Sequence, residues 1–433
     1  MKNNKLSKKI ECMVFMLLIF CISHLLAEPC GDVNSDSSIN IVDALLIAQY
    51  YVGLNPENFD QNAADVNADG SINIVDALLI AQLYVGLITE LPGCAETPTP
   101  TPDDTQEPTP QSDCSTGLIG WAAVSANGVN TTTGGGNASP VTVTTFEEFR
   151  SAAQDSSPQV IIVSGTIRTT DGDGYGMKVA SNKTIMGANN SATIYGGIEM
   201  NGVSNVIIQN LNFQGVYPNS GPGDTIASKN SHHIWYDHLA LWDADDGLLD
   251  ITRESSYQTV SWCKFYYTNS SNGHRLASLN GSGGGDHPED WGNLKVTYHH
   301  NWWGKLVTSR MPRVMYGQGH QFNNYFNSPG NGYCIGVGSY GSILVENNYF
   351  KEVNNPHQFM YDVYMYAAAS GNIYDNCSGA QDTGEGGSRH ACPDNDCTVH
   401  EHMDPGPFTP PYDYTLDPAA AVPNIVTNCA GPQ

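Results

Sequence analysis

The sequence predicts two folded units of different class. Residues 114–433 are expected to form an all-β right-handed parallel β-helix, and residues 28–95 a small α-helical unit with two EF-hand-type calcium loops. Short strands with alternating apolar residues recur at intervals of roughly 23 to 27 residues in the larger unit, without a helical pattern between them. A stretch near the N-terminus is repeated almost residue for residue. Residues 96–113, rich in Thr-Pro pairs, predict an extended spacer between the units.

Residues 1–27 are typical of a secretory signal peptide. Lys2, Lys5, Lys8 and Lys9 give a positive start, an apolar run follows, and Ala27 is the small residue before the expected cleavage point. The apolar run is too short to span a membrane comfortably, so we expect a secreted protein with no stable membrane insertion. The formal net charge of −26 argues against nucleic-acid binding, because no basic face is available to neutralise phosphates.

The cysteines predict at least one disulfide. In an oxidising compartment, Cys30 and Cys94 bracket the small unit and are the first expected pair. Cys392 and Cys397 are close enough in sequence for a second pair. Cys263 and Cys334 lie in apolar strands and are expected to be buried thiols.

The repeat near the N-terminus begins at Gly31 and again at Ala64. Each copy places oxygen-bearing side chains at loop positions one, three, five, nine and twelve, and an apolar helical run follows. These residues are Asp32, Asn34, Asp36, Asn40 and Asp43 in the first copy and Asp65, Asn67, Asp69, Asn73 and Asp76 in the second. This is the spacing of an EF-hand calcium loop. Residues 30–94 contain no Lys or Arg, so we expect this unit to need Ca²⁺ to fold.

The paired loops resemble a dockerin, a module that binds cohesin domains and attaches enzymes to a multi-enzyme scaffold. Ser37 stands where the first loop usually has a glycine at its turn, and Ala48-Gln49 and Ala81-Gln82 replace a basic pair common after the loop. The resemblance therefore implies calcium binding more directly than it implies a cohesin partner. The alternative is a calcium-stabilised module with a purely structural role.

The strands expected in the larger unit cover residues 205–213, 233–241, 259–267, 294–303, 321–326 and 343–350. Asn301, Asn324 and Asn348 fall at nearly equal intervals, which predicts an asparagine ladder at a repeated turn. A β-sandwich is the alternative, but it would need hairpin turns roughly every 8 to 12 residues. One longer gap, residues 269–292, is rich in Gly, Ser and Asn and is expected to line a cleft.

Carboxylates crowd one stretch of the larger unit, between His232 and Ile251. They are Asp237, Asp243, Asp245, Asp246 and Asp250. So many like charges repel one another unless they are solvated or neutralised, so the stretch predicts either a wet acidic loop or a Ca²⁺ site. Arg275, Arg310 and Arg313 follow in a unit poor in cations. Metal and guanidinium together suit a polyanionic substrate.

From Gly120 to near the C-terminus the chain resembles polysaccharide lyase family 1, the pectate lyases. The most specific motifs are I-W-Y-D-H, D-G-L-L-D-I, V-S-W-C-K-F, K-V-T-Y-H-H-N-W-W and S-R-M-P-R-V-M-Y-G, in that order. The family folds as a parallel β-helix and cleaves polygalacturonate by Ca²⁺-dependent β-elimination. The resemblance implies the same fold, substrate and cofactor here.

The resemblance also implies roles for individual residues. Asp224, Asp246 and Asp250 look like the calcium carboxylates. Arg310, the first arginine of R-M-P-R, looks like the catalytic base, although a guanidinium is ordinarily protonated and a poor base.

Substrate contacts are implied for three further residues. Arg275, or the neighbouring His274, occupies the region where the family commonly has a substrate-binding lysine. Arg313 is either a substrate contact or a member of a structural ion pair. The family often has another arginine two residues beyond P-R, where this chain has Met315, so binding of a carboxylate at that subsite is open.

Two other functions are weighed against a pectate lyase. A pectin lyase would act on methylated polymer without Ca²⁺; Met315 and Trp302-Trp303 favour it slightly, and the three calcium aspartates argue against it. A catalytically inactive β-helix would only bind pectin or a scaffold. A hydrolase would need an acid and base pair of carboxylates, with no arginine at its centre.

Overall fold

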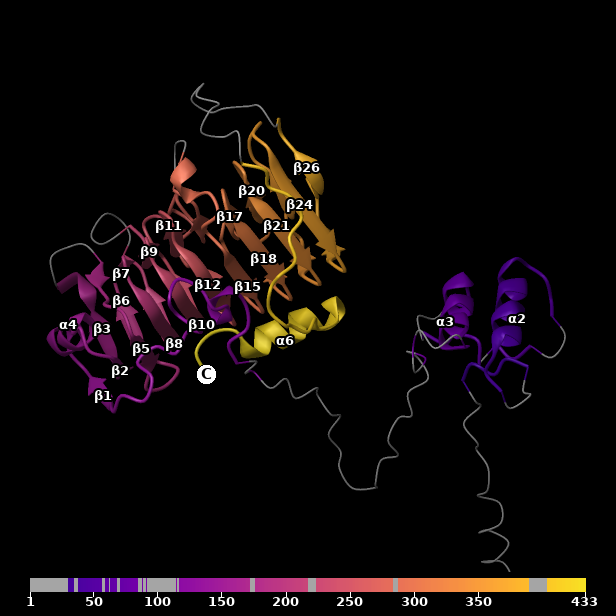
Figure 1. Cartoon of the computed structure of the whole chain (residues 1–433), viewed down its shortest axis with the longest axis horizontal. Helices are drawn as coiled ribbons and strands as arrows, with labels where there is room; N and C mark the ends of the chain where they lie inside the picture. Colours follow the sequence, from indigo (N-terminus) through magenta and orange to yellow (C-terminus); the bar gives the residue numbers. More distant parts are fainter. Residues whose placement is uncertain are drawn as a thin grey trace, which may run out of the picture. The chain divides into compact units, whose positions relative to one another are not determined.

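A computed structural model of the chain describes residues 30–34, 38–56, 59–61, 63–67, 71–84, 88, 91, 114, 117–171, 176–216, 223–282, 287–388 and 403–433. The predicted signal peptide and the Thr-Pro spacer lie outside these residues. The chain divides into two compact units, Met1–Pro108 and Thr109–Gln433 (Figure 1). No helix among the described residues is long and apolar enough to cross a membrane.

In the described part of the N-terminal unit, α2 (Ile41–Tyr51) and α3 (Ile74–Tyr84) pack against each other. Asn40 caps α2 by accepting a hydrogen bond from Val42 N at 2.8 Å, and Asp43 Oδ2 accepts one from Asn40 N at 2.8 Å. The second copy repeats this capping box through Asn73 and Asp76. The core consists of small and branched residues: Val33, Ala44, Ile47, Ala63, Ala64, Val66, Ala77, Ile80 and Leu91.

The C-terminal unit is a parallel β-helix with three sheet faces (Figure 1). The first face consists of β1 (Pro140–Val143), β2 (Gln159–Val163), β5 (Lys183–Gly187), β8 (Ser204–Gln214), β10 (His232–Trp242), β12 (Ser256–Ser261), β15 (Val296–His299), β18 (Gln318–Phe322), β21 (Ser342–Glu346) and β24 (Met365–Ser370). Each strand pairs in parallel with the strand one coil later. The strands that were expected from alternating apolar residues are therefore confirmed for this face.

The second face continues from the long strands β8 and β10, which turn from one face onto the next. It also contains β3 (Thr166–Arg168), β6 (Thr193–Tyr195), β13 (Lys264–Tyr266), β16 (Trp302–Trp303), β19 (Tyr325–Phe326), β22 (Tyr349–Lys351) and β25 (Ile373–Asp375). β26 (Gly384–Gly386) is the exception to parallel pairing, since it runs antiparallel to β24.

The third face consists of shorter strands and carries Asp250, at the end of the acidic stretch. Its members are β4 (Met177–Lys178), β7 (Ile198–Asn201), β9 (Ile226–Lys229), β11 (Leu249–Thr252), β14 (Leu279–Asn280), β17 (Arg313–Val314), β20 (Ile335–Val337) and β23 (His357–Phe359). Short 3-10 turns lie elsewhere in the unit, at Trp121–Ala123, Thr169–Asp171, Pro288–Asp290 and Ala419–Ala421.

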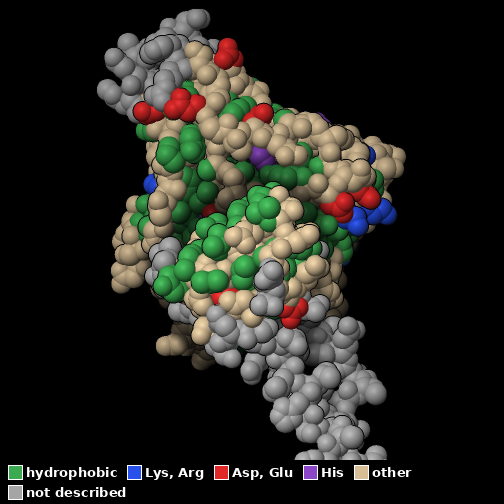
Figure 2. Space-filling model, turned by 90° about the vertical axis from the view of Figure 1, so that its right-hand side faces the viewer, with side chains coloured by type: hydrophobic (Ala, Val, Ile, Leu, Met, Phe, Trp, Pro, Cys, Tyr) green, Lys and Arg blue, Asp and Glu red, His purple; other side chains and the backbone are tan. Residues whose placement is uncertain are grey.

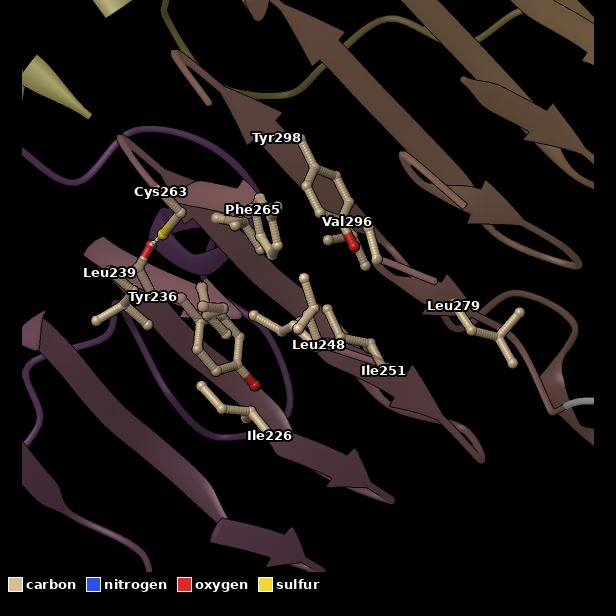
Figure 3. Close-up of a cluster of buried hydrophobic side chains, with 14 of the residues drawn as sticks. Ile226, Tyr236, Leu239, Leu248, Ile251, Cys263, Phe265, Leu279, Val296 and Tyr298 are labelled. Atoms are coloured by element: carbon tan, nitrogen blue, oxygen red, sulfur yellow. Dashed lines mark hydrogen bonds between the residues drawn. The ribbon is translucent and has the colours of Figure 1, made fainter. Parts of the chain in front are cut away.

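The interior of the β-helix is filled by stacked side chains (Figure 3). Along the second face, Phe265 stacks on Trp303 with ring centroids 4.3 Å apart, and the stack continues through Phe326, Phe350 and Tyr374. Equivalent positions of successive coils face the same interior volume, so like side chains stack along the axis. Such close packing makes this core a rigid support for its outer faces.

The predicted asparagine ladder is confirmed. Asn301 Nδ2 donates to Asn324 Oδ1, and Asn324 Nδ2 donates to Asn348 Oδ1, each at 3.0 Å. The ladder has a further rung that the sequence analysis missed, since Asn348 Nδ2 donates to Asn372 Oδ1 at 3.0 Å. The amides also bond to backbone groups of neighbouring coils, as Asn324 Nδ2 does to Tyr298 O. The ladder therefore satisfies buried backbone groups at the turn between the first two faces.

Helices and a disulfide close the two ends of the larger unit. α4 (Phe146–Gln154) buries Phe149 and Ala153 against the first coils. α6 (Val422–Cys429) packs Val422 and Val426 against Tyr325. Its last residue, Cys429, forms a disulfide with Cys114, a pair that the sequence analysis did not foresee.

The other cysteines agree in part with expectation. Cys263 and Cys334 are buried free thiols, as predicted. Cys30 is in a disulfide, whereas Cys94, its expected partner, lies outside the described residues, as do Cys392 and Cys397. Cys377 is a further free thiol and is half-buried.

Candidate active site

The third sheet face brings together residues that are far apart in the sequence. Asp250 on β11 pairs with Ala227 on β9, and the register continues from Asp250 through Leu279 to Arg313 on β17. Just before these strands, Gly247, Leu276 and Ser309 are joined by parallel bridges. Asp246, Asp250 and Arg310 lie together here, because Arg310 Nη1 is within 4.0 Å of both carboxylates. The charges of Asp246 and Arg310 also act on Asp224.

Each of the three aspartates is held differently. Asp224 Oδ1 accepts a hydrogen bond from Gly247 N, and Asp250 Oδ1 accepts one from Leu279 N, both at 2.9 Å. Gly247 is needed for close approach, because a Cβ at this position would collide with the Asp250 carboxylate. Asp246 Oδ1 is a buried atom without a hydrogen-bond partner, although the rest of that side chain is half exposed.

Crowding of these carboxylates changes their acidity. Burial raises the pKa of Asp224 to about 6, and the charge of Asp246 adds to this effect. Burial also raises the pKa of Asp250 well above its ordinary value, as does the charge of Asp224, whereas Arg310 opposes the shift. The site is therefore short of positive charge, a condition that a bound cation relieves.

Arg310 lies directly beside the aspartates. Its Nη1 atom is 3.9 Å from Asp250 Oδ2 and 4.0 Å from Asp246 Oδ1, and its side chain is 18 % exposed. The backbone of Arg310 is in the left-handed region, with φ of 60°, and its carbonyl accepts a hydrogen bond from Ser278 N at 2.7 Å. A strained backbone conformation that the neighbouring strand holds in place is common at functional sites.

The two candidates in the long loop differ in how their side chains are used. His274 Nδ1 lies 3.9 Å from Asp246 Oδ1, and the imidazole is exposed. Arg275 instead donates from Nε to Leu306 O at 3.0 Å and from Nη1 to the carbonyls of Ser270 and Asn272. His274 therefore faces the acidic group, whereas the Arg275 guanidinium ties the loop to itself and to the next coil.

Arg313 lies farther along the same face, beyond Arg310. Its Nη1 donates to Tyr361 Oη at 3.4 Å. Burial raises the pKa of the Tyr333 hydroxyl, and the charges of Arg313 and Arg310 partly oppose this shift. Met315, where a second arginine is common, is only 5 % exposed and packs between Gly281 and Gly338.

Several residues around the site were not singled out from the sequence. Tyr267 is fully buried, and its Oη lies 2.8 Å from Leu276 O and 3.1 Å from Asp246 O, beneath the loop that carries His274. Lys229 lies 3.5 Å from Glu199 and is among the cations that lower the pKa of Asp224. Lys229 and Glu199 line a cavity of about 100 Å³ beside Asp224. Only the coil register reveals these residues, because none belongs to a local motif.

Two other aspartates of the acidic stretch, Asp237 and Asp243, have structural partners. Asp237 is buried and accepts hydrogen bonds from Ser261 Oγ at 2.7 Å and Gln209 Nε2 at 3.2 Å. Asp243 accepts hydrogen bonds from the backbone and the hydroxyl of Thr268. These contacts join neighbouring coils of the first and second faces, and they separate the structural aspartates from Asp224, Asp246 and Asp250.

The donor set fits a hard cation that is also bound by other ligands. Carboxylate oxygens are the ligands that Ca²⁺ prefers. Asp246 Oδ1 is a buried acceptor that receives no hydrogen bond, so it is available to a cation. Among the described residues, however, no three His, Cys, Asp or Glu side chains converge closely enough to hold a metal by themselves. A cation on this face would need further oxygens from solvent or from a bound anion.

The calcium loops of the N-terminal unit are described in part. Asp43 and Asp76 are fully buried, and their Oδ1 atoms accept hydrogen bonds from Val33 N and Val66 N at 3.0 and 3.1 Å. Each of these carboxylates thus ties the end of its loop to the beginning. Asp36 and Asp69, predicted at loop position five, lie outside the described residues.

Comparison with known proteins agrees with this geometry. The family model described as Pectate lyase matches residues 79–433, and the Dockerin type I domain model matches residues 30–83. A Pectate trisaccharide-lyase from Thermotoga sp. (strain RQ2) is 36 % identical over 334 residues, covering 72 % of this chain and 88 % of the relative. Pectate lyase A from Emericella nidulans is 38 % identical over 216 residues, covering 48 % of this chain and 62 % of the relative.

Solved structures of pectate lyases are also similar to this chain. A pectate lyase from Bacillus sp. N165, in complex with trigalacturonate, superposes with a TM-score of 0.56 and 26 % identity, covering 73 % of this chain and 98 % of that one. A pectate lyase variant from Xanthomonas campestris superposes with a TM-score of 0.54 and 27 % identity, again over 73 % of this chain and 98 % of that one. The parallel β-helix, the acidic face with its arginine and these likenesses together place the chain in the pectate lyase family of polysaccharide lyases.

Proposed function

We propose that the chain is a secreted enzyme that cleaves polygalacturonate by Ca²⁺-dependent β-elimination and leaves 4,5-unsaturated oligogalacturonides. The position of Arg310 carries this proposal, because one guanidinium faces both Asp246 and Asp250 on an accessible sheet face. Relatives named Pectate trisaccharide-lyase, and the Bacillus structure that holds trigalacturonate, support the substrate class. They also suggest trisaccharides as a product to look for.

The reaction begins at C5 of a galacturonosyl unit, whose proton is α to the carboxylate. Arg310 Nη1 takes this proton, the electrons of the C5–H bond form the C4–C5 double bond, and the C4–O4 bond breaks. O4 leaves with its electron pair and is protonated by solvent. Arg310 must be neutral to accept the proton, and its Nη1 lies 3.9 Å from Asp250 Oδ2 and 4.0 Å from Asp246 Oδ1.

Each remaining residue of the face has a separate task. Ca²⁺ held by Asp224, Asp246 and Asp250 would neutralise the substrate carboxylate beside C5 and stabilise the charge that develops there. His274 and Arg313 flank the reacting centre on either side and would bind neighbouring sugar units. Arg275 keeps the loop that carries His274 in place, through its bonds to three carbonyls.

The test follows the ultraviolet absorbance of unsaturated uronides on two substrates, polygalacturonate and methylated pectin, with Ca²⁺ and with a chelator. We expect the absorbance to rise on polygalacturonate only when Ca²⁺ is present. Absence of a rise on both substrates would reject lyase activity and favour a β-helix that only binds. Activity that persists in the chelator would reject the calcium mechanism and favour a pectin lyase.

A second proposal is that the N-terminal module attaches the enzyme to a cohesin domain of an extracellular scaffold. Its two helices expose equivalent apolar residues: Ile41, Val42 and Leu45 on α2, and Ile74, Val75 and Leu78 on α3. Hydrophobic side chains cover much of this unit's surface in the view of Figure 2. Exposed apolar patches of this kind usually bind another protein.

Capture by a purified cohesin domain tests this proposal. The Leu45→Asp/Leu78→Asp double variant is expected to lose binding, because it places a charge on both apolar surfaces. Its lyase activity should match that of the unchanged chain, since the β-helix is a separate unit. Failure of the unchanged chain to bind in Ca²⁺ would leave the module with a structural role only.

A further inference from the structure

The third sheet face changes character beyond Arg313, from charged to apolar. Tyr361, directly after β23, is 43 % exposed. Among the described residues of the β-helix, Tyr361 and Val141 are the only large apolar side chains counted as exposed. Val141 lies on β1 of another sheet, at the first coil. Tyr361, by contrast, lies on the substrate face and in contact with Arg313.

Two glycines allow three large side chains to pack around Tyr361. A Cβ on Gly338 would lie 2.7 Å from Met315 Cγ and 3.1 Å from Tyr361 Cε2. A Cβ on Gly336 would lie 2.9 Å from Tyr333 Cε2 and 3.0 Å from Met360 Sδ. Met315, Tyr333, Met360 and Tyr361 therefore cover the bare backbone of β20 and form one surface, which we call the Tyr361 platform. Met315 is its buried floor and Tyr361 its exposed part.

Positive charge is scarce at this end of the face. Arg313 and Arg310 are the cations that act on Tyr333. From Val314 to Ser388 the sequence has a single Lys or Arg, Lys351, which belongs to β22 on the second face. Among the described residues, a galacturonosyl carboxylate placed over the platform would thus have only Arg313 nearby, which already contacts Tyr361 Oη, so its loss of solvent would be poorly compensated.

We propose that the Tyr361 platform is a sugar subsite that accepts a methyl-esterified galacturonosyl unit. Esterification removes the charge that the platform cannot neutralise, and the methyl group is buried against apolar side chains and thioethers. The exposed Tyr361 ring offers a flat apolar surface to the C–H face of a pyranose. This inference rests on the proposed lyase function and adds that the enzyme cleaves partly methylated pectin, with the free carboxylate at the reacting unit.

The experiment compares kcat/KM on partly methylated pectin with kcat/KM on polygalacturonate, both in Ca²⁺. Tyr361→Lys places a cation on the exposed part of the platform, where it costs little stability. We expect this variant to lower the ratio of methylated to unmethylated substrate by about fivefold, the upper range for one exposed ion pair. Tyr361→Ala removes the ring without adding charge and is expected to reduce kcat/KM mainly on the methylated substrate.

Val141→Lys is the matched control, because it makes the same apolar-to-Lys change at the other exposed apolar side chain. It should leave both values of kcat/KM unchanged. An unchanged ratio in Tyr361→Lys, or an equal loss on both substrates in both Tyr361 variants, would overturn the subsite. If the unchanged chain cleaves neither substrate, the proposed lyase function fails instead.

Discussion

Arg310 combines an unusual backbone with a fixed position beside two carboxylates. Its carbonyl bonds to Ser278 N on the neighbouring coil, so the strand pairing holds the residue in place independently of its side chain. Arg310→Ala should therefore keep the fold and lose turnover, with kcat falling by about 10³ if Arg310 is the base. Uronide absorbance measures activity, and circular dichroism with thermal unfolding measures the fold.

Arg313→Ala serves as the comparison for that variant. Arg313 lies on the same face but contacts Tyr361 rather than the aspartates. Its removal should raise KM while turnover remains measurable, because it takes away a substrate contact and not the base. If Arg310→Ala keeps appreciable kcat, Arg310 is not the base, whatever the effect of Arg313→Ala.

Asp224 makes calcium binding dependent on pH. Its pKa is raised to about 6, so the carboxyl must lose a proton when the cation binds below that pH. The Ca²⁺ concentration for half-maximal lyase activity should therefore rise by at least about tenfold for each pH unit below 6, because Asp250, whose pKa is also raised, must lose its proton as well. Activity titrations at several pH values measure this, and Asp224→Asn should flatten the dependence in whatever activity remains.

Without metal, the contribution of Asp224 to the free energy of unfolding should instead decrease as the pH rises. The folded chain favours the protonated form of Asp224, so this contribution is fully present below the ordinary aspartate pKa and is lost as the pH rises through about 6. Excess Ca²⁺ should cancel the loss above that pH. A thermal shift on adding Ca²⁺ that is no larger at pH 8 than at pH 5 would contradict this assignment.

The asparagine ladder is the best test at the level of the elements. Asn324 donates to Tyr298 O and Asn348 Oδ1, and its own Oδ1 accepts from the backbone and side chain of Asn301. Asn324→Ala leaves these buried groups unpaired and opens a gap, so we expect a loss of about 3 kcal/mol in unfolding free energy. Denaturant unfolding measures it, and Asn372→Ala, at the half-buried end of the ladder, should cost less.

Alternation in the long strands made most of this fold predictable. β8 and β10 span eleven residues each, enough for a period of two to be visible, and their bounds nearly match those expected. β14 and β17 have two residues each, and no period can be seen in so short a segment. These short strands set the position of Arg313 and of the platform, so coil geometry and not local pattern determines that part of the site.

The same limit explains which site residues were predicted. The aspartates and Arg310 belong to local motifs, and the sequence analysis named them together. His274 and Arg275 are adjacent in the sequence, which therefore cannot tell which of them faces the aspartates. The structure distinguishes them, because the Arg275 guanidinium is bonded to backbone carbonyls. Tyr361 follows β23, two coils beyond Arg310, and no motif marks it.

At the scale of the whole molecule, the disulfide shows a further limit of sequence reasoning. Cys114 and Cys429 are 315 residues apart, at the two ends of the larger unit. Sequence separation says nothing about such a pair, since only the path of the coils brings Cys114 and α6 together. The bond ties both ends of the larger unit to one another and adds stability mainly by restricting its unfolded state.

Calcium should act on the two units separately. The N-terminal unit has a small core and no Lys or Arg between Cys30 and Cys94, so its folding is expected to need Ca²⁺. The β-helix has an extensive core and should stay folded without the cation. Calorimetry of the full chain should give two transitions in Ca²⁺ and only that of the β-helix in a chelator.

The Asp43→Ala/Asp76→Ala variant separates metal loss in the small unit from metal loss at the lyase site. Both carboxylates are buried and close their loops onto Val33 and Val66, so removing them should abolish the transition of the N-terminal unit even in Ca²⁺. The β-helix transition, and its shift on adding Ca²⁺, should persist because the lyase aspartates are intact. A single transition that disappears as a whole in chelator would show that the two units unfold cooperatively and that Ca²⁺ holds both.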